Sequence, residues 1–224
     1  MAKLSIVIDL DLCIGCNACT LACKAEHGTQ RAVFWGKVLE HEVGKTPAVT
    51  RLFLPVLCNH CENPPCREVC PTRATHVDED GVVLVDYDKC IGCKYCSWAC
   101  PYGARELDEQ QKVMKKCTLC IDRISDESLP PSERKPACVL ACPTSARLFG
   151  DVHDPDSEVS VAIREQGGYQ LMPEWGTKPA NHYLPRRKTS LKIHEDELHR
   201  VDNPLLEELE VPVDEGAAID DVAF

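Results

Sequence analysis

Four groups of four cysteines contain all sixteen cysteines of the 224-residue chain, and no other feature constrains its fold as strongly. The first and third groups share the spacing C-x2-C-x2-C-x3-C, the second reads C-x2-C-x4-C-x3-C, and the fourth is divided into C-x2-C and C-x3-C. A proline directly follows the last cysteine of groups two, three and four. The groups are, in order, Cys13, Cys16, Cys19 and Cys23; Cys58, Cys61, Cys66 and Cys70; Cys90, Cys93, Cys96 and Cys100; and Cys117, Cys120, Cys138 and Cys142.

This spacing is typical of ligands to cubane [4Fe–4S] clusters. Three cysteines two residues apart wrap one cluster, and the fourth, three residues further on, ligates a neighbouring cluster. A disulfide framework is disfavoured because such frameworks belong to oxidising compartments, and residues 1–12 lack the pattern of a secretory signal. Structural zinc needs two C-x2-C pairs and a spacer, which only the fourth group resembles. The cysteines therefore predict iron–sulfur clusters.

The composition predicts that these clusters also stabilise the fold. The hydrophobic fraction of 44 % includes the cysteines, and aromatic residues make up only 5 % of the chain. The conventional apolar core is therefore thin. Because metal-binding free energy becomes folding free energy when the site does not exist in the unfolded chain, we expect the cluster-free protein to be poorly folded.

The net charge of −11 is concentrated at the C-terminus. Residues 195–224 contain eleven acidic residues and one basic residue, which leaves about −1 for residues 1–194. We interpret this end as a partly disordered acidic tail, with docking onto a partner subunit as the alternative. No basic surface pattern points to nucleic acid. No run of eighteen apolar residues predicts a membrane span.

An internal repeat indicates the fold class. Residues 8–16 (IDLDLCIGC) resemble residues 85–93 (VDYDKCIGC), and residues 70–74 (CPTRA) resemble residues 142–146 (CPTSA). Each unit reads as a short strand, a cysteine loop with a glycine and a short helix. The sequence predicts strands over 5–8, 49–56 and 82–85, and a helix over 17–26. The sequence therefore predicts an α+β fold of duplicated bacterial ferredoxin-like modules with an extended C-terminal tail.

The cysteine-free C-terminal part is predicted to be separate from these modules. We expect a tandem ferredoxin-like domain over residues 1–150, an extended partner-docking segment over 151–194 and the acidic tail over 195–224. The polar stretch 121–135 reads as a loop, 151–157 as a turn, 159–166 as a short helix and 167–187 as extended chain. The expected anchors for a partner are Tyr169, Leu171, Trp175, Tyr183 and Leu184.

Four motifs carry a resemblance to a known family. They are residues 58–72 (CNHCENPPCREVCPT), 88–96 (DKCIGCKYC), 116–120 (KCTLC) and 141–144 (ACPT). Here the chain resembles the four-cluster iron–sulfur subunits of dimethyl sulfoxide reductase-type molybdopterin oxidoreductases. That family includes subunits of polysulfide, thiosulfate and tetrathionate reductases and of membrane-bound sulfite dehydrogenase. The resemblance covers residues 4–150 strongly and the remainder weakly.

The resemblance implies four [4Fe–4S] clusters, with iron held through cysteines in exchanged sets. Group one pairs with group four, and group two pairs with group three. The implied sets are Cys13, Cys16, Cys19 and Cys142 for cluster 1; Cys117, Cys120, Cys138 and Cys23 for cluster 2; Cys58, Cys61, Cys66 and Cys100 for cluster 3; and Cys90, Cys93, Cys96 and Cys70 for cluster 4.

The resemblance also implies an electron-transfer subunit that is not an enzyme by itself, and no catalytic constellation stands out in the sequence. The implied partners are a molybdopterin-containing catalytic subunit and an integral membrane subunit that reacts with quinone, in a complex acting on a sulfur oxyanion. The alternative is a polyferredoxin-type subunit of a hydrogenase or formate-linked complex, or a freestanding polyferredoxin. We expect a cytoplasmic position at the inner membrane through a partner, with co-export to the periplasm as the alternative.

Several residues near the predicted ligands are candidates for tuning the clusters. We expect His60 to lie beside the ligands or on the surface, without binding iron. Three aromatic residues are expected to pack around the clusters: Tyr95, Trp98 and Tyr102. Five lysines are expected either to raise local reduction potentials or to be solvated: Lys24, Lys89, Lys94, Lys115 and Lys116.

Overall fold

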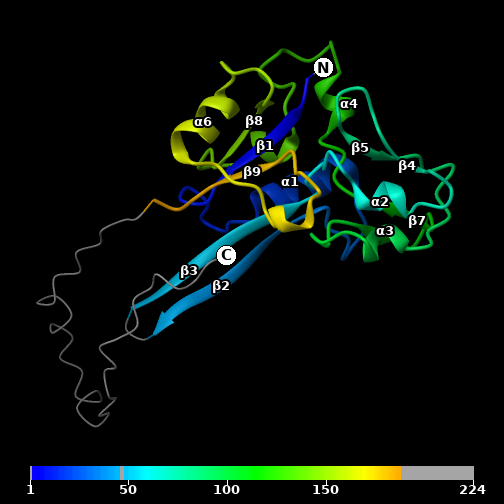
Figure 1. The fold of residues 1–224 in the computed structure, drawn as a ribbon, viewed down its shortest axis with the longest axis horizontal. Coiled ribbons are helices and arrows are strands. Elements are labelled where there is room, and N and C mark those ends of the chain that lie inside the picture. Colours follow the sequence, from blue (N-terminus) through cyan, green and yellow to red (C-terminus); the bar gives the residue numbers. More distant parts are fainter. Residues whose placement is uncertain (1, 46–47, 188–224) are drawn as a thin grey trace, which may run out of the picture. The chain divides into compact units, whose positions relative to one another are not determined.

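The structure is a computed structural model that describes residues 2–45 and 48–187. Within them, small sheets alternate with short helices (Figure 1). The strands are β1 (Leu4–Asp9), β2 (Gly36–Lys45), β3 (Ala48–Leu57), β4 (Thr75–Val77), β5 (Val83–Val85), β6 (Glu106–Asp108), β7 (Val113–Lys115), β8 (Arg147–Asp151) and β9 (His182–Leu184). The helices are α1 (Ala18–His27), α2 (Pro65–Glu68), α3 (Tyr95–Trp98), α4 (Ile121–Ile124), α5 (Ala137–Leu140), α6 (Glu158–Gln166) and the 3-10 turn η1 (Pro173–Trp175).

Strand β1 is the centre of the largest sheet, which has the order β8-β1-β9. It runs antiparallel to β8 and parallel to β9. Its apolar run Ile6, Val7 and Ile8 is fully buried, as expected for a strand covered on both faces. Val7 packs under α6 together with Val159, whereas Ile6 and Ile8 belong to the main core. The expected strand over 5–8 and the expected helix over 159–166 are therefore confirmed within one residue.

The part of the chain after residue 150 differs from the expectation of a separate segment. Residues 151–187 pack in the same compact unit as the cysteine-rich part. The Tyr183 side chain is fully buried, and its hydroxyl donates to the Pro55 carbonyl over 2.8 Å. Leu184 is also buried. These two apolar side chains are therefore used inside this chain and are not available as anchors for a partner.

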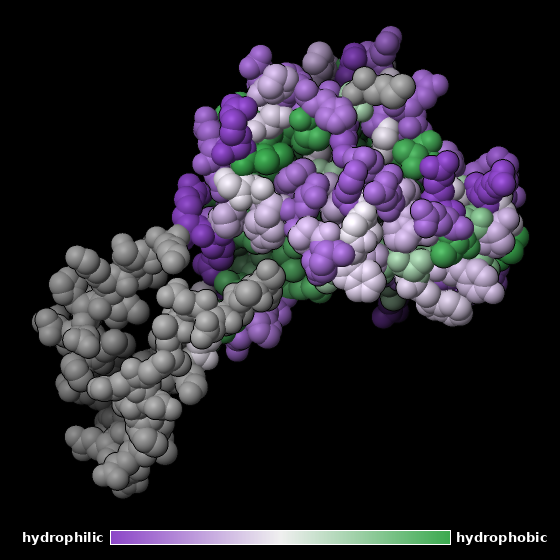
Figure 2. Space-filling model, viewed as in Figure 1, coloured by the Kyte–Doolittle hydropathy of each residue, from purple (hydrophilic) through white to green (hydrophobic). Residues whose placement is uncertain are grey.

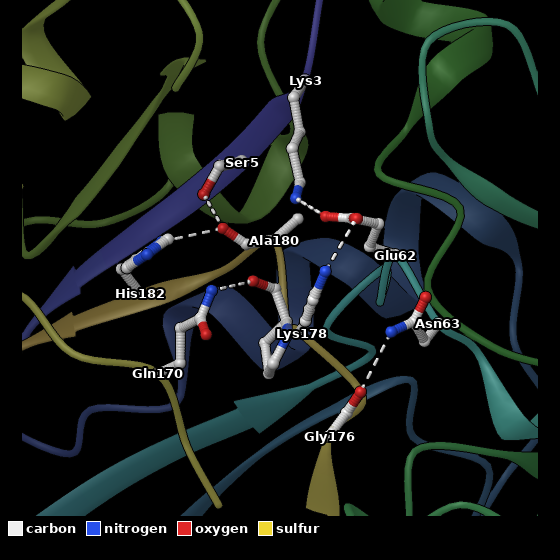
Figure 3. A network of polar contacts seen from close by, with 10 residues as sticks. Lys3, Ser5, Glu62, Asn63, Gln170, Gly176, Lys178, Ala180 and His182 are labelled. Atoms are coloured by element: carbon white, nitrogen blue, oxygen red, sulfur yellow. Dashed lines mark hydrogen bonds and ion pairs between the residues drawn. The ribbon is translucent and has the colours of Figure 1, made fainter. Parts of the chain in front are cut away.

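A polar network explains how this segment is held (Figure 3). The Ser5 hydroxyl of β1 donates to the Ala180 carbonyl over 2.7 Å. The carboxylate of Glu62, in the second cysteine group, binds both Lys3 and Lys178. Asn181 accepts from the Ile6 amide and donates to the Cys58 carbonyl. The segment after residue 150 thus connects β1 to the second cysteine group.

The remaining elements follow the predictions in part. The helix expected over 17–26 is α1, and the strands expected over 49–56 and 82–85 are β3 and β5. Strand β2 has no counterpart among the predicted strands; it pairs with β3 over ten residues, from Gly36 opposite Leu57 to Lys45 opposite Ala48, as a long two-stranded ribbon (Figure 1). The loop expected over 121–135 begins with the helical turn α4. The acidic tail over 195–224 lies outside the described residues.

Candidate iron–sulfur cluster sites

Two cysteine loops are built in the same way by distant segments. The Asp9 amide after β1 donates to the Ala146 carbonyl, and the Asp86 amide after β5 donates to the Ala74 carbonyl, each over 2.8 Å. Each aspartate carboxylate then accepts two backbone amides at the start of its cysteine loop. The first loop is therefore fastened to the end of group four, and the third is fastened to the end of group two.

Glycine is required at the turn of both loops. Gly15 and Gly92 have φ values of +69° and +66°, in the left-handed region that favours glycine. A Cβ atom at Gly92 would collide with the backbone carbonyl of Lys112, and one at Gly15 would collide with the Phe53 ring. Only glycine lets these loops turn while another part of the chain lies against them.

One recess gathers cysteines from the first and fourth groups. Cys13, Cys16, Cys19 and Cys142 line it, together with Pro143 and Arg147. It contains about 340 Å³ of space between atoms, part of which is open to solvent. Burial raises the pKa of the Cys13 thiol, and neighbouring thiols Cys19 and Cys142 raise it further. These four side chains meet although Cys142 is far from the others in sequence.

A second recess gathers cysteines from the second and third groups. Cys58, Cys61, Cys66 and Cys100 line a recess with about 330 Å³ of space between atoms, part of which is open to solvent. Burial raises the pKa of Cys61 to about 12, with a further contribution from Cys58. Such a thiol must lose its proton before it can bind a metal, since the metal ligand is the thiolate.

The other cysteines of groups one and four form a buried cluster. Burial raises the pKa of Cys23 to about 12, and nearby Cys138 and Cys120 raise it further. Cys117 is buried, and this burial holds its pKa well above the usual value, with Cys23 and Cys138 adding to the effect. Cys23 therefore lies with the cysteines of the fourth group and not in the recess of its own group.

The remaining thiols of groups two and three carry backbone contacts. The Met114 amide donates to Cys90 Sγ over 3.3 Å, and the Thr75 amide donates to Cys70 Sγ over 3.5 Å. Cys96 is buried, which raises its pKa, and its sulfur lies near those of Cys90 and Cys93. Amide donors of this kind raise the reduction potential of iron–sulfur centres.

The donor set fits a soft, sulfur-ligated cofactor. All sixteen cysteines lie in the described residues, and none forms a disulfide. Two recesses each present four thiols, and amide donors approach several of the sulfurs, among them Leu119 N–H to Cys117 Sγ at 3.4 Å. Among the described residues, no group of three or more His, Cys, Asp or Glu side chains is close enough together to hold a single metal ion. The four-thiol recesses fit [4Fe–4S] clusters in the chemistry of their donor atoms.

The candidate tuning residues differ in their burial. His60 is buried, and its Nδ1 accepts the Val83 amide, so the surface alternative is wrong for it. Lys116 is also buried. Tyr95 and Trp98 are 50 % and 76 % exposed, so the expectation that they pack around the clusters is wrong. Helix α3, which carries both residues, turns these rings outward, where they contact each other.

The other candidate lysines have ordinary structural roles or lie at the surface. Lys24 donates to the backbone carbonyls of Gln30 and Val33, so it fastens the chain after α1. Lys115 forms an ion pair with Asp108 at 2.8 Å. Lys89 and Lys94 lie at the surface. Tyr102, in contrast, lines the second recess and shares a hydrogen bond of 2.6 Å with Thr177.

Two buried arginines beside the cysteines are absent from the sequence-based candidates. Arg105 Nη2 lies 2.8 Å from Cys66 Sγ, and Arg147 Nη2 lies 3.4 Å from Cys19 Sγ. A sequence signal marks both positions: residues 100–105 (CPYGAR) and 142–147 (CPTSAR) share the pattern C-P-x-x-A-R. In both segments the arginine directly follows the alanine of this pattern, Ala104 or Ala146.

Fold and sites together define a ferredoxin-like iron–sulfur protein. The profile of the 4Fe–4S dicluster domain matches residues 49–152, and that of the 4Fe–4S binding domain matches residues 6–26. The two matches together contain all four cysteine groups. Iron–sulfur clusters of the 4Fe–4S type are therefore the cofactors of this chain.

Relatives specify the family. The B subunit of sulfite dehydrogenase from Allochromatium vinosum is 59 % identical over the full length of both proteins. The B subunit of tetrathionate reductase from Salmonella typhimurium is 41 % identical over 81 % of this chain and 72 % of its own length. For the B polypeptide of polysulfide reductase from Wolinella succinogenes, the identity is 38 % and the covered shares are 85 % and 98 %.

This chain therefore belongs to the family of iron–sulfur electron-transfer subunits of dimethyl sulfoxide reductase-type molybdopterin oxidoreductases. It is an electron-transfer subunit and not a catalytic one. None of the helices in the described residues combines the length and the apolar sequence needed to span a bilayer.

Proposed function

We propose that this chain relays single electrons through four [4Fe–4S] clusters between a molybdopterin catalytic subunit and a quinone-reactive membrane anchor. The observation that carries the proposal is the exchange of cysteines between groups: Cys142 joins the first group, and Cys100 joins the second. This exchange is how paired clusters share two ferredoxin-type runs, and paired clusters at short range conduct electrons. Relatives named for sulfite, tetrathionate and polysulfide support a sulfur compound, with sulfite favoured, as the substrate of the complex.

The proposed ligand sets are those that the family resemblance implies. The two recesses support clusters 1 and 3, and the proximity of Cys23 to Cys120 and Cys138 supports cluster 2. Cluster 4 is supported by the fastening of the third loop to the end of group two, which brings in Cys70. The sets are Cys13, Cys16, Cys19 and Cys142; Cys117, Cys120, Cys138 and Cys23; Cys58, Cys61, Cys66 and Cys100; and Cys90, Cys93, Cys96 and Cys70.

A bound cubane cluster supplies one-electron chemistry. The residues of this chain hold its thiolates, exclude water and set the charge around it. Cys58, Cys66 and Cys117 are buried, and a low-dielectric interior disfavours the more negative, reduced state. Amides such as that of Leu119 donate to cysteine sulfur and favour the reduced state. The reduction potential of each cluster therefore depends on the balance of burial against donors and nearby charge.

Exposed apolar side chains beside two loops support contact with two partners. Ile14 and Leu21 are 57 % and 64 % exposed near the first group, and Ile91 and Trp98 are 65 % and 76 % exposed near the third group. Apolar residues also interrupt the hydrophilic surface on the face seen in Figure 2. We propose that the first and third cysteine groups face different subunits, and that residues 151–194 add contacts to one of them.

We place the protein at the inner membrane through its partner, on the cytoplasmic side. The alternative is the periplasm, reached by export together with a partner that carries a signal. The alternative function is a polyferredoxin-type subunit of a hydrogenase or formate-linked complex. It has less support, because the three relatives described above are named for the chemistry of sulfur compounds.

Purification of the tagged chain from solubilised membranes tests this function. We expect a large molybdenum-containing protein and an integral membrane protein to co-purify in stoichiometric amounts, and sulfite to reduce a quinone analogue only in their presence. Trp98→Ala and Ile91→Ala, at exposed positions, are expected to weaken the association with one of the partners. Isolation of the chain alone, or with a nickel-containing hydrogenase subunit, contradicts the proposal.

A further inference from the structure

Three cationic side chains are buried among the cysteines and have no carboxylate partner in the part of the chain that the structure describes. Arg105, Arg147 and Lys116 are 4 %, 6 % and 1 % exposed. Within residues 2–45 and 48–187, the ion pairs between basic side chains and carboxylates involve other lysines and arginines. A buried charge is costly unless it is paired. The counter-charge for these cations must therefore come from something other than Asp or Glu.

Arg147, at the start of β8, contacts two sets of cysteines. Its Nη2 lies 3.4 Å from Cys19 Sγ, and its Nη1 lies 3.8 Å from Cys138 Sγ. Burial lowers the pKa of this guanidinium, but the charges of Cys138 and Cys19 outweigh burial and leave it above its usual value. Cys19 and Cys138 belong to the sets proposed for clusters 1 and 2, so Arg147 lies between these two clusters.

Arg105 occupies the equivalent position in the other half of the chain. It follows its Cys-Pro pair by the same number of residues as Arg147, and Nη2 lies 2.8 Å from Cys66 Sγ. Nη1 donates to the Thr75 hydroxyl over 3.1 Å. The Thr75 amide in turn donates to Cys70 Sγ over 3.5 Å. Cys66 and Cys70 belong to the sets proposed for clusters 3 and 4.

Lys116 lies between the fourth cysteine group and the segments that adjoin the second and third groups. Its Nζ donates to the carbonyl of Cys117 over 2.6 Å and to the carbonyl of Val83. The Val83 amide in turn donates to His60, which stands between Cys58 and Cys61. Because His60 Nδ1 accepts this amide, it does not itself carry a proton. Lys116 is thus hydrogen-bonded to Cys117 of the cluster 2 set and is connected, through Val83 and His60, to the segment that carries Cys58 and Cys61 of the cluster 3 set.

We propose that one buried cation lies between each pair of neighbouring clusters and raises the reduction potential of both. The cation is Arg147 between clusters 1 and 2, Lys116 between clusters 2 and 3, and Arg105 between clusters 3 and 4. The proposal rests on the proposed cluster assignment. The thiolate-ligated clusters supply the negative charge that the buried cations lack. The cation stabilises the reduced cluster, which carries one more negative charge than the oxidised one.

The consequence for electron transfer is that the reduction potentials of neighbouring clusters depend on the same cation. Because one cation lies beside two clusters, it raises both potentials and changes the difference between them little. Neutralising it without changing its size lowers both potentials. At the effective dielectric constant of about 20 that describes buried charges, we expect a change of at least about tenfold in the reduction equilibrium of each neighbouring cluster, which is about 59 mV or more for a one-electron couple.

Redox titration of the purified complex, monitored by electron paramagnetic resonance, tests the proposal with three variants. We expect Arg147→Gln to lower two of four potentials, Arg105→Gln to lower the other two, and Lys116→Gln to lower one from each pair. This overlapping pattern identifies the order of the cations without prior assignment of the signals. Lys115→Gln is the matched control, because Lys115 is paired with Asp108, and we expect it to shift the potentials less than Lys116→Gln does. Arg51→Gln, which breaks the surface ion pairs with Glu40 and Glu42, controls for arginine, and we expect it to leave all four potentials unchanged.

Several outcomes overturn the proposal: unchanged potentials in Arg147→Gln or Arg105→Gln, equal shifts of all four potentials, or a Lys115→Gln shift as large as that of Lys116→Gln. If a glutamine variant loses iron, Arg147→Lys and Arg105→Lys decide, since they keep the charge. Near-native potentials in the lysine variants support the proposal, and loss of iron there as well shows that the arginine serves the fold and overturns it. A wild-type complex with fewer than four cluster signals refutes the proposed function instead, so the two failures are distinguishable.

Discussion

Replacing Cys23 by alanine removes the same cluster signal as replacing Cys120, and replacing Cys142 removes the same signal as replacing Cys16. This result is expected because Cys23 lies beside Cys120 and Cys138, whereas Cys142 shares its recess with Cys16. Loss of one of four ligands removes or converts one cluster of the four, and iron falls by up to about a quarter. The measurement is the spectrum of each reduced variant, together with its iron content.

The comparison includes its own control, because each cysteine variant is compared with a variant from a different cysteine group. If Cys23→Ala instead removed the signal lost in Cys16→Ala, each group would serve its own cluster and the exchange between groups would be wrong. Cys16 is a suitable reference because its side chain is exposed. Its replacement is therefore expected to disturb the protein core little.

Ending the chain after Gly150 is expected to abolish cluster assembly. The deletion removes Val159, Tyr183 and Leu184, which are fully buried against β1 and its neighbours. Burial of each large apolar side chain contributes about 1.5–3 kcal/mol, so the three together contribute about 5–9 kcal/mol. That loss is comparable with the whole stability of an ordinary domain, about 5–15 kcal/mol. We expect little soluble protein and an iron content near zero after anaerobic expression.

A second truncation separates this effect from that of the acidic end. A chain ending after Arg187 keeps the whole compact unit and is expected to retain its clusters, whatever it loses in association with partners. If the chain ending after Gly150 assembled clusters as well as the longer one, the boundary predicted at residue 150 would be right and the core role of β9 would be wrong.

Cysteine spacing predicts most of the chemistry of this chain, because ligand spacing for a cubane cluster is imposed by the cluster itself. The strands before groups one and three are also predictable, since Ser5 to Ile8 and Val82 to Val85 are short and apolar and precede the cysteine loops. The helix α6 is predictable because Ser157 caps it by accepting the Ser160 amide and a glycine ends it.

What escapes prediction depends on contacts between distant residues. Strand β2 has few buried side chains, so its sequence lacks a clear strand pattern. The segment forms a strand because it pairs with β3 in the folded protein. The short strand β9 follows a Pro- and Gly-rich stretch that reads as extended chain, and only the buried contacts of Asn181 and Tyr183 show that it belongs to the core. Arg105 and Arg147 escape because a basic residue is ordinarily exposed, and their burial follows from the cysteines around them.

The iron and acid-labile sulfide content of the anaerobically purified chain tests the central claim most directly. Four cubane clusters predict close to sixteen iron and sixteen sulfide per chain, from sixteen free cysteines in four groups. Values near eight of each, or zinc in stoichiometric amounts with little iron, would contradict the account of a four-cluster electron-transfer subunit.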